Sequence, residues 1–276
     1  MYDVFQTDRL IDLWLTEDIG SCDLTAQLMI DEDAVGTFHM NAREPMYIAG
    51  LVIAARIFTR YDAALTVTKL AKDGDKVEKG TRILTVSGPA RSILTAERPA
   101  LNILQRLCGI ATETARYNAE IAGTGARLID TRKTTPGLRM LEKHAVACGG
   151  GLNHRLGLDN GVMLKDNHIA VAGSIGKAVA RAKLKLPVLT KIEVECDRFE
   201  QVEESLAAGA DVIMLDNMSI ADMTAAVKFV AGRAKIEASG GISIATIRNV
   251  ALTGVDYIST SKITQAAPAV DIGLDE

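Results

Sequence analysis

Basic side chains recur through residues 130–169, and this is the stretch of the chain best suited to binding an anion. It reads DTRKTTPGLRMLEKHAVACGGGLNHRLGLDNGVMLKDNHI, and the side chains that could do chemistry are Arg132, Lys133, His154, Arg155, Lys165 and His168. Folding alone does not require them, because Arg and Lys are rarely buried without a partner. A cluster of cations in a partly dry pocket is stable only when an anion joins it. The stretch therefore predicts a site for a polyanionic small molecule.

The positions of these cations relative to apolar runs indicate where the site lies. Arg132 and Lys133 follow Leu128-Ile129, and Lys165 follows an apolar run that ends at Leu164. Each cation thus comes where a buried strand runs out, which is where α/β enzymes keep their ligand-binding groups.

Later strand ends carry oxygen-bearing side chains and glycines rather than cations. In chain order they are Glu193 and Glu195, then Asp216, then Ser239, Gly240 and Gly241, then Ser259 to Ser261. Paired carboxylates suit Mg²⁺ or the hydroxyls of a ribose. A Gly-Gly turn before a helix suits a phosphate. The residues indicate a phosphorylated sugar held with Mg²⁺ beside a polycarboxylate; interior salt bridges that fill a barrel are the alternative.

The elements that must position these residues alternate between strand and helix. Six short apolar runs cover residues 126–131, 161–167, 188–195, 212–217, 235–241 and 257–262, and amphipathic stretches lie near 138–147, 174–185, 198–208, 219–231 and 243–252. Alternating β and α units predict a parallel sheet with right-handed crossovers. Periodicity alone leaves both a barrel and an open doubly wound sheet.

The first part of the chain has a different texture. We expect a helix over residues 7–16, a turn at 23–25, antiparallel strands within 34–88 and a helix over 48–61. Residues 92–120 predict a long connecting helix interrupted near Pro99, which would begin near Glu97 and place Arg98 at a helix N-terminus. A cation is unfavourable there, and that is a weak indication of function. Residues 1–110 would form an α+β domain with its connecting helix and 111–276 the second domain, its C-terminal end returning to the first.

Bulk properties exclude several classes of function. The chain has 276 residues and a net charge of −4, which does not suit a nucleic-acid-binding protein. Neither a P-loop nor a G-x-G-x-x-G motif occurs. The cysteines form no C-x-x-C pair and show no metal-ligand spacing, and neither a signal peptide nor a membrane span is visible, so we expect a cytoplasmic protein with free thiols.

Six motifs in order carry a resemblance to a known family. The strings DTRKTTPG, GGGLNHR, LKDNHI, KIEVE, MLDN and EASGGI resemble those of the quinolinate phosphoribosyltransferases, and the match runs from about Leu15 to the C-terminus. The resemblance implies an α/β protein with an N-terminal α+β sandwich-like domain and an incomplete α/β barrel of about six parallel strands. It implies condensation of quinolinate with phosphoribosyl pyrophosphate to give nicotinate mononucleotide, pyrophosphate and CO₂, with Mg²⁺ as cofactor.

The same resemblance implies a role for each matching residue. Arg132, His154 and Arg155 would grip the two quinolinate carboxylates, joined by Arg98 of a neighbouring subunit in a homodimer, with a hexamer as the alternative. Lys133, Lys165 and His168 would face the pyrophosphate, Glu195 and Asp216 the ribose hydroxyls and Mg²⁺, and Ser239, Gly240 and Gly241 the 5′-phosphate. Thr131, Thr260 and Ser261 complete the substrate-binding set, and Lys133, Lys165, Glu195 and Asp216 are the expected catalytic residues.

One departure and three alternatives accompany this interpretation. The family that this chain resembles often has Gly where this chain has Ser261, so the side chain would either displace the phosphate or offer it a hydroxyl contact. A related transferase could act on another acid, and a Schiff-base aldolase could use Lys165 or Lys191. The hairpin over residues 74–88 also resembles that of biotinyl or lipoyl carriers, with Lys76 or Lys79 as the modified residue.

Overall fold

The computed structural model describes residues 3–276 and divides them into two compact units. The first comprises residues up to 115 together with 135–150 and 266–276, and the second comprises 116–134 and 151–265. The chain therefore passes between the units several times, unlike a simple cut after residue 110. Residues 135–150, which the strand and helix alternation would place with the parallel sheet, belong to the first unit.

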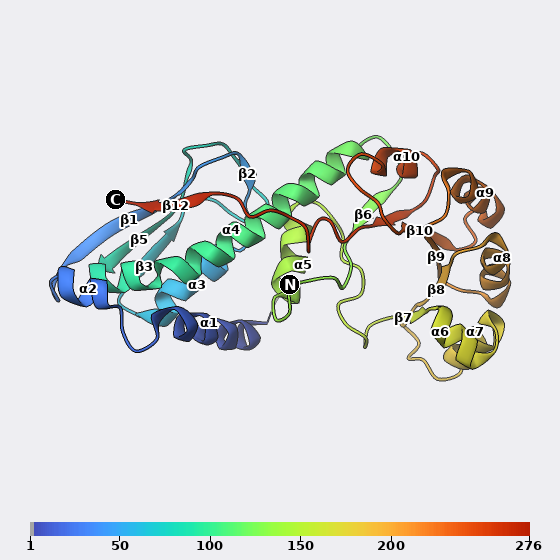
Figure 1. The fold of residues 1–276 in the computed structure, drawn as a ribbon, viewed down its shortest axis with the longest axis horizontal. Coiled ribbons are helices and arrows are strands. Elements are labelled where there is room, and N and C mark those ends of the chain that lie inside the picture. Colours follow the sequence, from blue (N-terminus) through green and yellow to red (C-terminus); the bar gives the residue numbers. More distant parts are fainter. Residues whose placement is uncertain (1–2) are drawn as a thin grey trace. The chain divides into compact units, whose positions relative to one another are not determined.

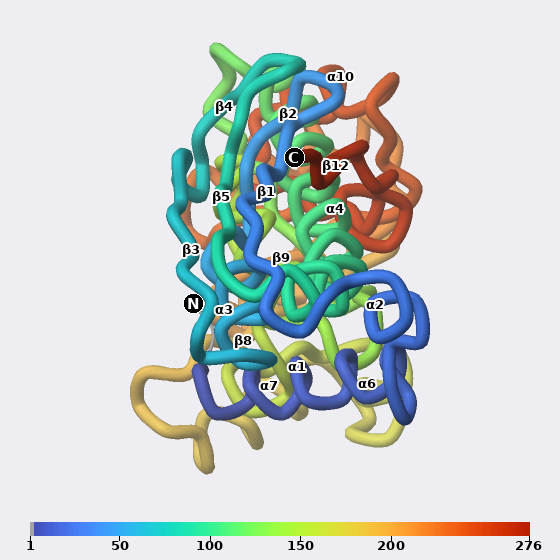
Figure 2. Tube along the Cα trace, turned by 90° about the vertical axis from the view of Figure 1, so that its left-hand side faces the viewer, coloured from blue at the N-terminus to red at the C-terminus, as the bar shows by residue number. Residues whose placement is uncertain are grey.

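The first unit is built on a four-stranded antiparallel sheet in the order β12-β1-β5-β3. Its strands are β1 (Val35–Ala42), β3 (Thr66–Lys69), β5 (Arg82–Pro89) and β12 (Ile272–Asp275), and β2 (Met46–Tyr47) pairs separately with β4 (Lys76–Val77). The C-terminal strand β12 lies beside β1 (Figures 1 and 2), so the end of the chain completes this sheet.

Five helices belong wholly or mainly to this unit. They are α1 (Val4–Ile19), α2 (Leu24–Met29), α3 (Leu51–Tyr61), α4 (Ala90–Glu120) and α5 (Arg139–Cys148). The α1 helix is longer than the expected 7–16 because Asp3 caps its start through the Gln6 N–H. Asp23 caps α2 in the same way through the Ala26 N–H, so a short helix stands where the sequence predicted a turn.

The α4 helix corrects a sequence prediction. It runs unbroken from Ala90 to Glu120 with Pro99 inside it, so the expected interruption and the start near Glu97 are wrong. Proline removes one backbone donor and ordinarily destabilises a helix interior. Here Ile93 and Ala96 before it and Leu101 after it are buried, and this packing holds both halves in place. Arg98 therefore lies within a helix, not at its N-terminus.

The second unit is a six-stranded parallel sheet in the order β6-β11-β10-β9-β8-β7. Its strands are β6 (Arg127–Ile129), β7 (Val162–Leu164), β8 (Ile192–Cys196), β9 (Val212–Asp216), β10 (Lys235–Ser239) and β11 (Tyr257–Ser259). Five of them lie within the predicted apolar runs, and β8 extends one residue beyond its run, to Cys196. Leu152 adds one parallel bridge to Ile129 at the β6 edge. The β6 and β7 strands are the two edges, which is the arrangement of an incomplete barrel.

Helices follow one another around this sheet (Figure 1). They are α6 (Asp166–Ala172), α7 (Ile175–Lys183), α8 (Phe199–Ala208), α9 (Ile220–Val230) and α10 (Ile247–Ala251). Side chains alternate between the two faces of the parallel sheet. Val194, Leu215 and Ala238 are fully buried on one face, and their neighbours in sequence point to the other face. Among the described helices, none joins the length and the apolar character that crossing a membrane would need.

Candidate active site

A cavity of about 530 Å³ lies in the second unit at the carboxyl ends of the parallel strands. It is lined by Thr131, Arg132, Lys133, His154, Arg155, Met163, Lys165, Glu195, Met214, Asp216, Asn217, Glu237, Ser239, Gly240, Gly241, Ile242, Ser259, Thr260, Ser261 and Lys262. Parallel strands deliver these residues from one edge of the sheet, which is where α/β folds place their ligand sites.

The cavity brings together the predicted site residues apart from two. Arg98 lies on α4 in the first unit, with 55% of its side chain exposed and Glu97 4.0 Å away. His168 lies in the first turn of α6, where its Nδ1 accepts the Lys165 N–H at 3.0 Å. The sequence predicted a strand end there and missed this helix. As placed, His168 helps to fix the backbone of Lys165.

Lys165 and Glu195 form the central charge pair. They extend from the ends of β7 and β8, and Lys165 Nζ donates a short hydrogen bond to Glu195 Oε2. The Lys165 side chain is 43% exposed and that of Glu195 20%, so the lysine can reach solvent or a ligand. An anion entering the cavity could take the ammonium, and this would release the carboxylate for a hydroxyl or a cation.

Arg132 and Arg155 form the cationic side of the cavity. Arg155 Nη1 donates to the Gly161 carbonyl at 3.1 Å, and Nη2 lies 3.7 Å from Met163 Sδ. Burial and the charge of Arg132 lower the pKa of Arg155, against the opposing charge of Glu193. Two guanidinium groups that repel each other beside a cavity gain most from an anion with more than one carboxylate.

Below the cavity-lining side chains at the strand ends, His154 lies between two buried glutamates. Its Nε2 lies 2.9 Å from Glu193 Oε2 and 3.4 Å from Glu237 Oε2, and the two glutamate residues are 6% and 1% exposed. Burial alone would lower the pKa of His154, but hydrogen bonds to both carboxylates and their charges raise it to about 10. Burial, with the charge of Glu193, raises the pKa of Glu237. The proton on Nε2 therefore separates two carboxylates that would otherwise repel.

His154 itself is held by its neighbours. Asp130, which is fully buried, accepts its backbone N–H at 2.8 Å and the Asn153 side-chain amide at 2.8 Å. The imidazole Nε2 thus already has two carboxylate partners, so this geometry supports a positioning role more directly than a grip on substrate.

The Gly240-Gly241 turn brings the backbone close to the cavity. Both glycines have positive φ, +93° and +62°. A Cβ on Gly240 would lie 2.3 Å from Asn217 Oδ1, so only glycine fits. The expected helix after the turn begins only at Ile247 and is five residues long, shorter than the predicted 243–252. The helix-dipole part of the phosphate prediction is therefore not supported, and the loop's backbone N–H groups are what the turn offers.

Thr260 and Ser261 close the same side. Thr260 Oγ1 donates to the Ile242 carbonyl at 2.9 Å and accepts the Lys262 N–H at 3.2 Å. Its hydroxyl is thereby committed to holding the loop after Gly241. Ser261 lines the cavity and is half-buried.

Sequence reasoning missed Glu237 and Asn217 as parts of the site. Glu237 lies two positions before Ser239, so both point to the same face of β10. A carboxylate between two apolar residues, Ile236 and Ala238, is a signal that could have revealed it. Asn217 has φ +56° and donates its side-chain amide to Asp216 Oδ2 at 3.0 Å. It orients the carboxylate that the sequence did identify.

The donor set can be tested for Mg²⁺. Glu195 and Asp216 supply carboxylate oxygens at the cavity, and Ser239 supplies a hydroxyl nearby on the adjacent strand. Mg²⁺ prefers oxygen ligands, takes one or two protein carboxylates and completes its shell with water and substrate phosphates. The residues fit a cation that arrives with a phosphorylated substrate.

Fold and site together define an enzyme of the α/β-barrel class that binds a polyanionic substrate at the carboxyl ends of its strands. Residues 23–108 match the model of the quinolinate phosphoribosyl transferase N-terminal domain, and residues 110–275 match that of the C-terminal domain. The chain belongs to the quinolinate phosphoribosyltransferase family.

Relatives and solved structures agree with this assignment. The chain is 44% identical to a probable nicotinate-nucleotide pyrophosphorylase (carboxylating) of Synechocystis sp., over 97% of this chain and 91% of the relative. A Bacillus subtilis protein of the same name is 42% identical, over 98% and 93%. The crystal structure of NadC from Streptococcus pyogenes superposes with a TM-score of 0.96 at 41% identity, covering 100% of this chain and 98% of that one.

Proposed function

We infer that this protein transfers the phosphoribosyl group of phosphoribosyl pyrophosphate to quinolinate and releases CO₂, giving nicotinate mononucleotide and pyrophosphate in NAD biosynthesis. The observation that carries the inference is the pairing of two mutually repelling arginines, Arg132 and Arg155, with Lys165 and two carboxylates in one cavity. A dicarboxylate would pair with the two arginines, and a phosphorylated sugar would interact with Lys165 and the two carboxylates.

The charges of the cavity fit the expected transition state. As the bond to pyrophosphate breaks, positive charge develops at C1′ of the ribose and negative charge on the leaving group. Lys133 and Lys165 stabilise the leaving pyrophosphate, and Glu195 and Asp216 stabilise the ribosyl cation and hold its hydroxyls. Such preorganised charges lower the barrier without a nucleophilic side chain. Glu195 and Asp216 are the residues that would hold Mg²⁺, and the ion would neutralise part of the negative charge of the phosphates.

Decarboxylation then follows from the product of the transfer. The ring nitrogen has become quaternary, and it stabilises the electron pair left at C2 when the bond to the carboxylate breaks and CO₂ departs. A proton then takes the place of CO₂ at C2. Arg132 and Arg155 hold the ring in place during this step, so that orientation is the main contribution of the protein.

We also propose that Ser239 and the backbone of Gly240-Gly241 bind the 5′-phosphate, with Thr131, Thr260 and Ser261 around it. Arg98, which is more than half exposed, would complete the carboxylate grip of a neighbouring subunit in a homodimer. Mixing inactive Arg98→Ala subunits with inactive Lys165→Ala subunits should restore activity in part. Failure to recover after verified subunit exchange would refute the shared site. A cytoplasmic location is part of the same proposal.

The direct test is product formation from quinolinate and phosphoribosyl pyrophosphate with Mg²⁺, followed by chromatography. Nicotinate serves as the control substrate because it lacks the second carboxylate. We expect product from quinolinate only, and a rise in KM for quinolinate on the order of 100-fold in Arg155→Ala, since a partly buried charge partner of the substrate carboxylate is lost. Product from neither acid would contradict the assignment and point to a relative that uses another acid.

A further inference from the structure

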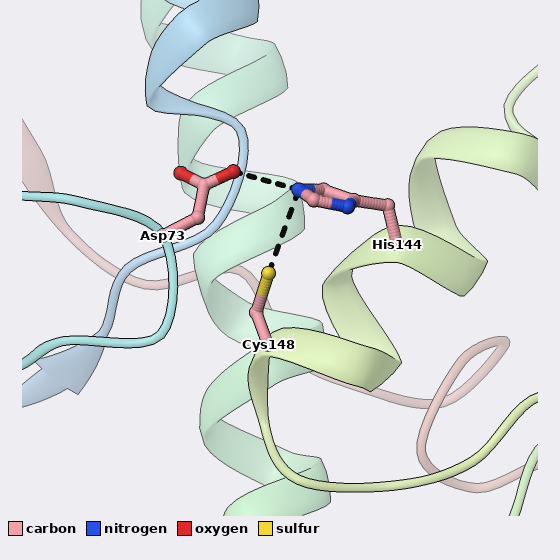
Figure 3. A group of neighbouring side chains, drawn as sticks. All are labelled: Asp73, His144 and Cys148. Atoms are coloured by element: carbon pink, nitrogen blue, oxygen red, sulfur yellow. Dashed lines mark hydrogen bonds and ion pairs between the residues drawn. The ribbon is translucent and has the colours of Figure 1, made fainter. Parts of the chain in front are cut away.

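Three side chains with metal-binding atoms meet in the first unit, which does not contribute to the cavity described above. Asp73 comes from the loop between β3 and β4, and His144 and Cys148 come from α5 (Figure 3). His144 Nε2 lies 2.6 Å from Asp73 Oδ2 and 3.5 Å from Cys148 Sγ, and the three ligand atoms all lie within 4.8 Å of one another. The proposed reaction uses none of them.

The arrangement is not that of a cysteine-histidine-aspartate catalytic triad. In a triad, the acid orients one ring nitrogen and the nucleophile gives its proton to the other. Here the carboxylate and the thiol both approach the same atom, Nε2 of His144 (Figure 3). Burial, with the charge of Asp73, raises the pKa of Cys148 to about 12, so at neutral pH it is a thiol and a poor nucleophile. A proton relay through His144 is therefore excluded by its geometry.

The same convergence is what a metal ion requires. His144 and Cys148 are four residues apart on one helix, which places them one turn apart on the same face. Tetrahedral zinc with bonds of about 2.3 Å to sulfur and about 2.0 Å to nitrogen places those two ligand atoms roughly 3.5 Å apart. That separation is already present between Cys148 Sγ and His144 Nε2. The distance between Asp73 Oδ2 and His144 Nε2 would have to lengthen by less than about 1 Å for both atoms to bind the same zinc ion.

Asp73 is held in place from behind. Its Oδ1 accepts the Leu51 N–H at 3.0 Å at the start of α3, leaving Oδ2 directed at His144. Hydrogen bonds of this kind orient metal-binding carboxylates and are costly to lose. The carboxylate is therefore oriented before a cation arrives.

We propose that Asp73, His144 and Cys148 form a binding site for a borderline-soft divalent cation, with Zn²⁺ the best match to one sulfur, one nitrogen and one oxygen ligand. The Asp73 and His144 side chains are 18% and 20% exposed, which leaves room for water as a fourth ligand. Sulfur selects against Mg²⁺ and Ca²⁺, which take oxygen ligands. A bound cation cross-links α5 to the β3–β4 loop and, through Leu51, to the start of α3.

The full-length protein, freed of metal by a chelator and dialysed, is titrated with Zn²⁺ by calorimetry and with Co²⁺ by absorption spectroscopy. Co²⁺ reports a bound thiolate through a charge-transfer band. Because the described lining of the active-site cavity has no cysteine, this band separates the two sites. We expect one equivalent bound with the band present, and proton release from the thiol. Zn²⁺ should raise the Tm.

Matched variants decide the assignment. Cys148→Ala should lose the band and weaken Zn²⁺ binding on the order of 100-fold or more, because a lost ligand costs at least as much as a lost supporting group. Asp73→Asn keeps the shape but loses the charge, and should weaken binding at least about 10-fold. Cys22→Ala removes another partly accessible thiol and should change neither result.

The same experiment includes a control for correct folding of the variants. The metal-free Tm of Cys148→Ala, or of Cys148→Ser should the alanine variant unfold, is compared with that of the unaltered protein. A similar metal-free Tm together with loss of the Zn²⁺-dependent rise supports the site. Absence of stoichiometric binding in the unaltered protein, or a thiolate band that persists in the Cys148 variants, would overturn it, and the three residues would then be a hydrogen-bonded cluster alone.

Discussion

Replacing His154 by alanine should destabilise the second unit more than it disturbs substrate contacts. The imidazole lies between the carboxylates of Glu193 and Glu237, which are 6% and 1% exposed. Removing it takes away the proton that lies between the two buried acids, although the charge of Arg155 still acts on Glu193. Loss of one partner from a buried ion pair commonly costs about 3–5 kcal/mol.

The magnitude has an upper limit because one acid can take up a proton. Glu237 is the better candidate, since burial already raises its pKa from the ordinary value of 4.5. Holding it protonated at pH 7, about 2.5 pH units above that value, costs about 3.4 kcal/mol, because each pH unit corresponds to about 1.4 kcal/mol. We therefore expect His154→Ala to lose up to about 3 kcal/mol at pH 7. In Glu237→Gln/His154→Ala, where the second charge is absent, much of that loss should be recovered.

The pH dependence gives a second measurement of the same group. The pKa of His154 is raised above 6.5, so its stabilising contribution is complete below pH 6.5 and is lost as the pH rises toward about 10. In His154→Ala the cost of protonating Glu237 falls as the pH is lowered. The difference between the two proteins should narrow from pH 7 toward pH 5, by up to about 1.4 kcal/mol per pH unit.

Urea unfolding followed by circular dichroism at several pH values measures both effects. His39→Ala is the control, because His39 lies on β1 in the first unit, where its Nδ1 is 2.9 Å from the hydroxyl of Thr85, and loss of this hydrogen bond should cost about 1 kcal/mol. An unchanged urea midpoint in His154→Ala, or a difference independent of pH, would refute the assignment of His154 as the cation that neutralises the buried acids.

Other predictions concern the rim of the cavity and the glycine turn. Lys165→Met should lower kcat by about 10²–10³-fold in steady-state kinetics, because a charge near the leaving group is lost; its urea midpoint should hold, since the side chain is 43% exposed, and a matching loss of stability would contradict a catalytic role. Gly240→Ala should lower stability by about 1–3 kcal/mol and activity with it, because φ is +93° and the new Cβ would meet Asn217. Gly232→Ala, at φ +76° with open space around it, is the comparison by thermal unfolding, and an equal Tm loss in both would show that backbone strain alone acts.

Much of the second unit follows from local sequence patterns. A short apolar run ending in a charged or glycine residue was sufficient to locate each strand of the parallel sheet, because strand ends and site residues coincide in this fold. Period-two alternation then places Glu193 with Glu195, and Glu237 with Ser239, on one face. Glu237 was overlooked because it lies inside its strand, where a charge has meaning only once its buried partners are known.

Other features depend on contacts that a local pattern does not contain. Pro99 predicts a break in isolation, but burial on both sides of it keeps α4 continuous. The partners Asp73 and His144 are 71 residues apart. Cysteine spacing alone could not reveal their cluster, because two of its three ligands are not cysteines. Residues 135–150 likewise belong to the first unit because of tertiary contacts, which a local sequence pattern does not contain.

Strand alternation places two functional layers on the same face of the sheet. Lys165, Glu195, Asp216 and Ser239 form the rim, and Glu193 and Glu237 lie two positions earlier in β8 and β10, beneath it. A charged side chain at the rim can leave its protein partner and bind a ligand, as Lys165 can leave Glu195. The carboxylates of the deeper layer cannot do so, because their partner is His154, which lies between them. Substitutions in the rim should therefore act on turnover, and those in the deeper layer on stability, although the two sets are separated by a single residue along each strand.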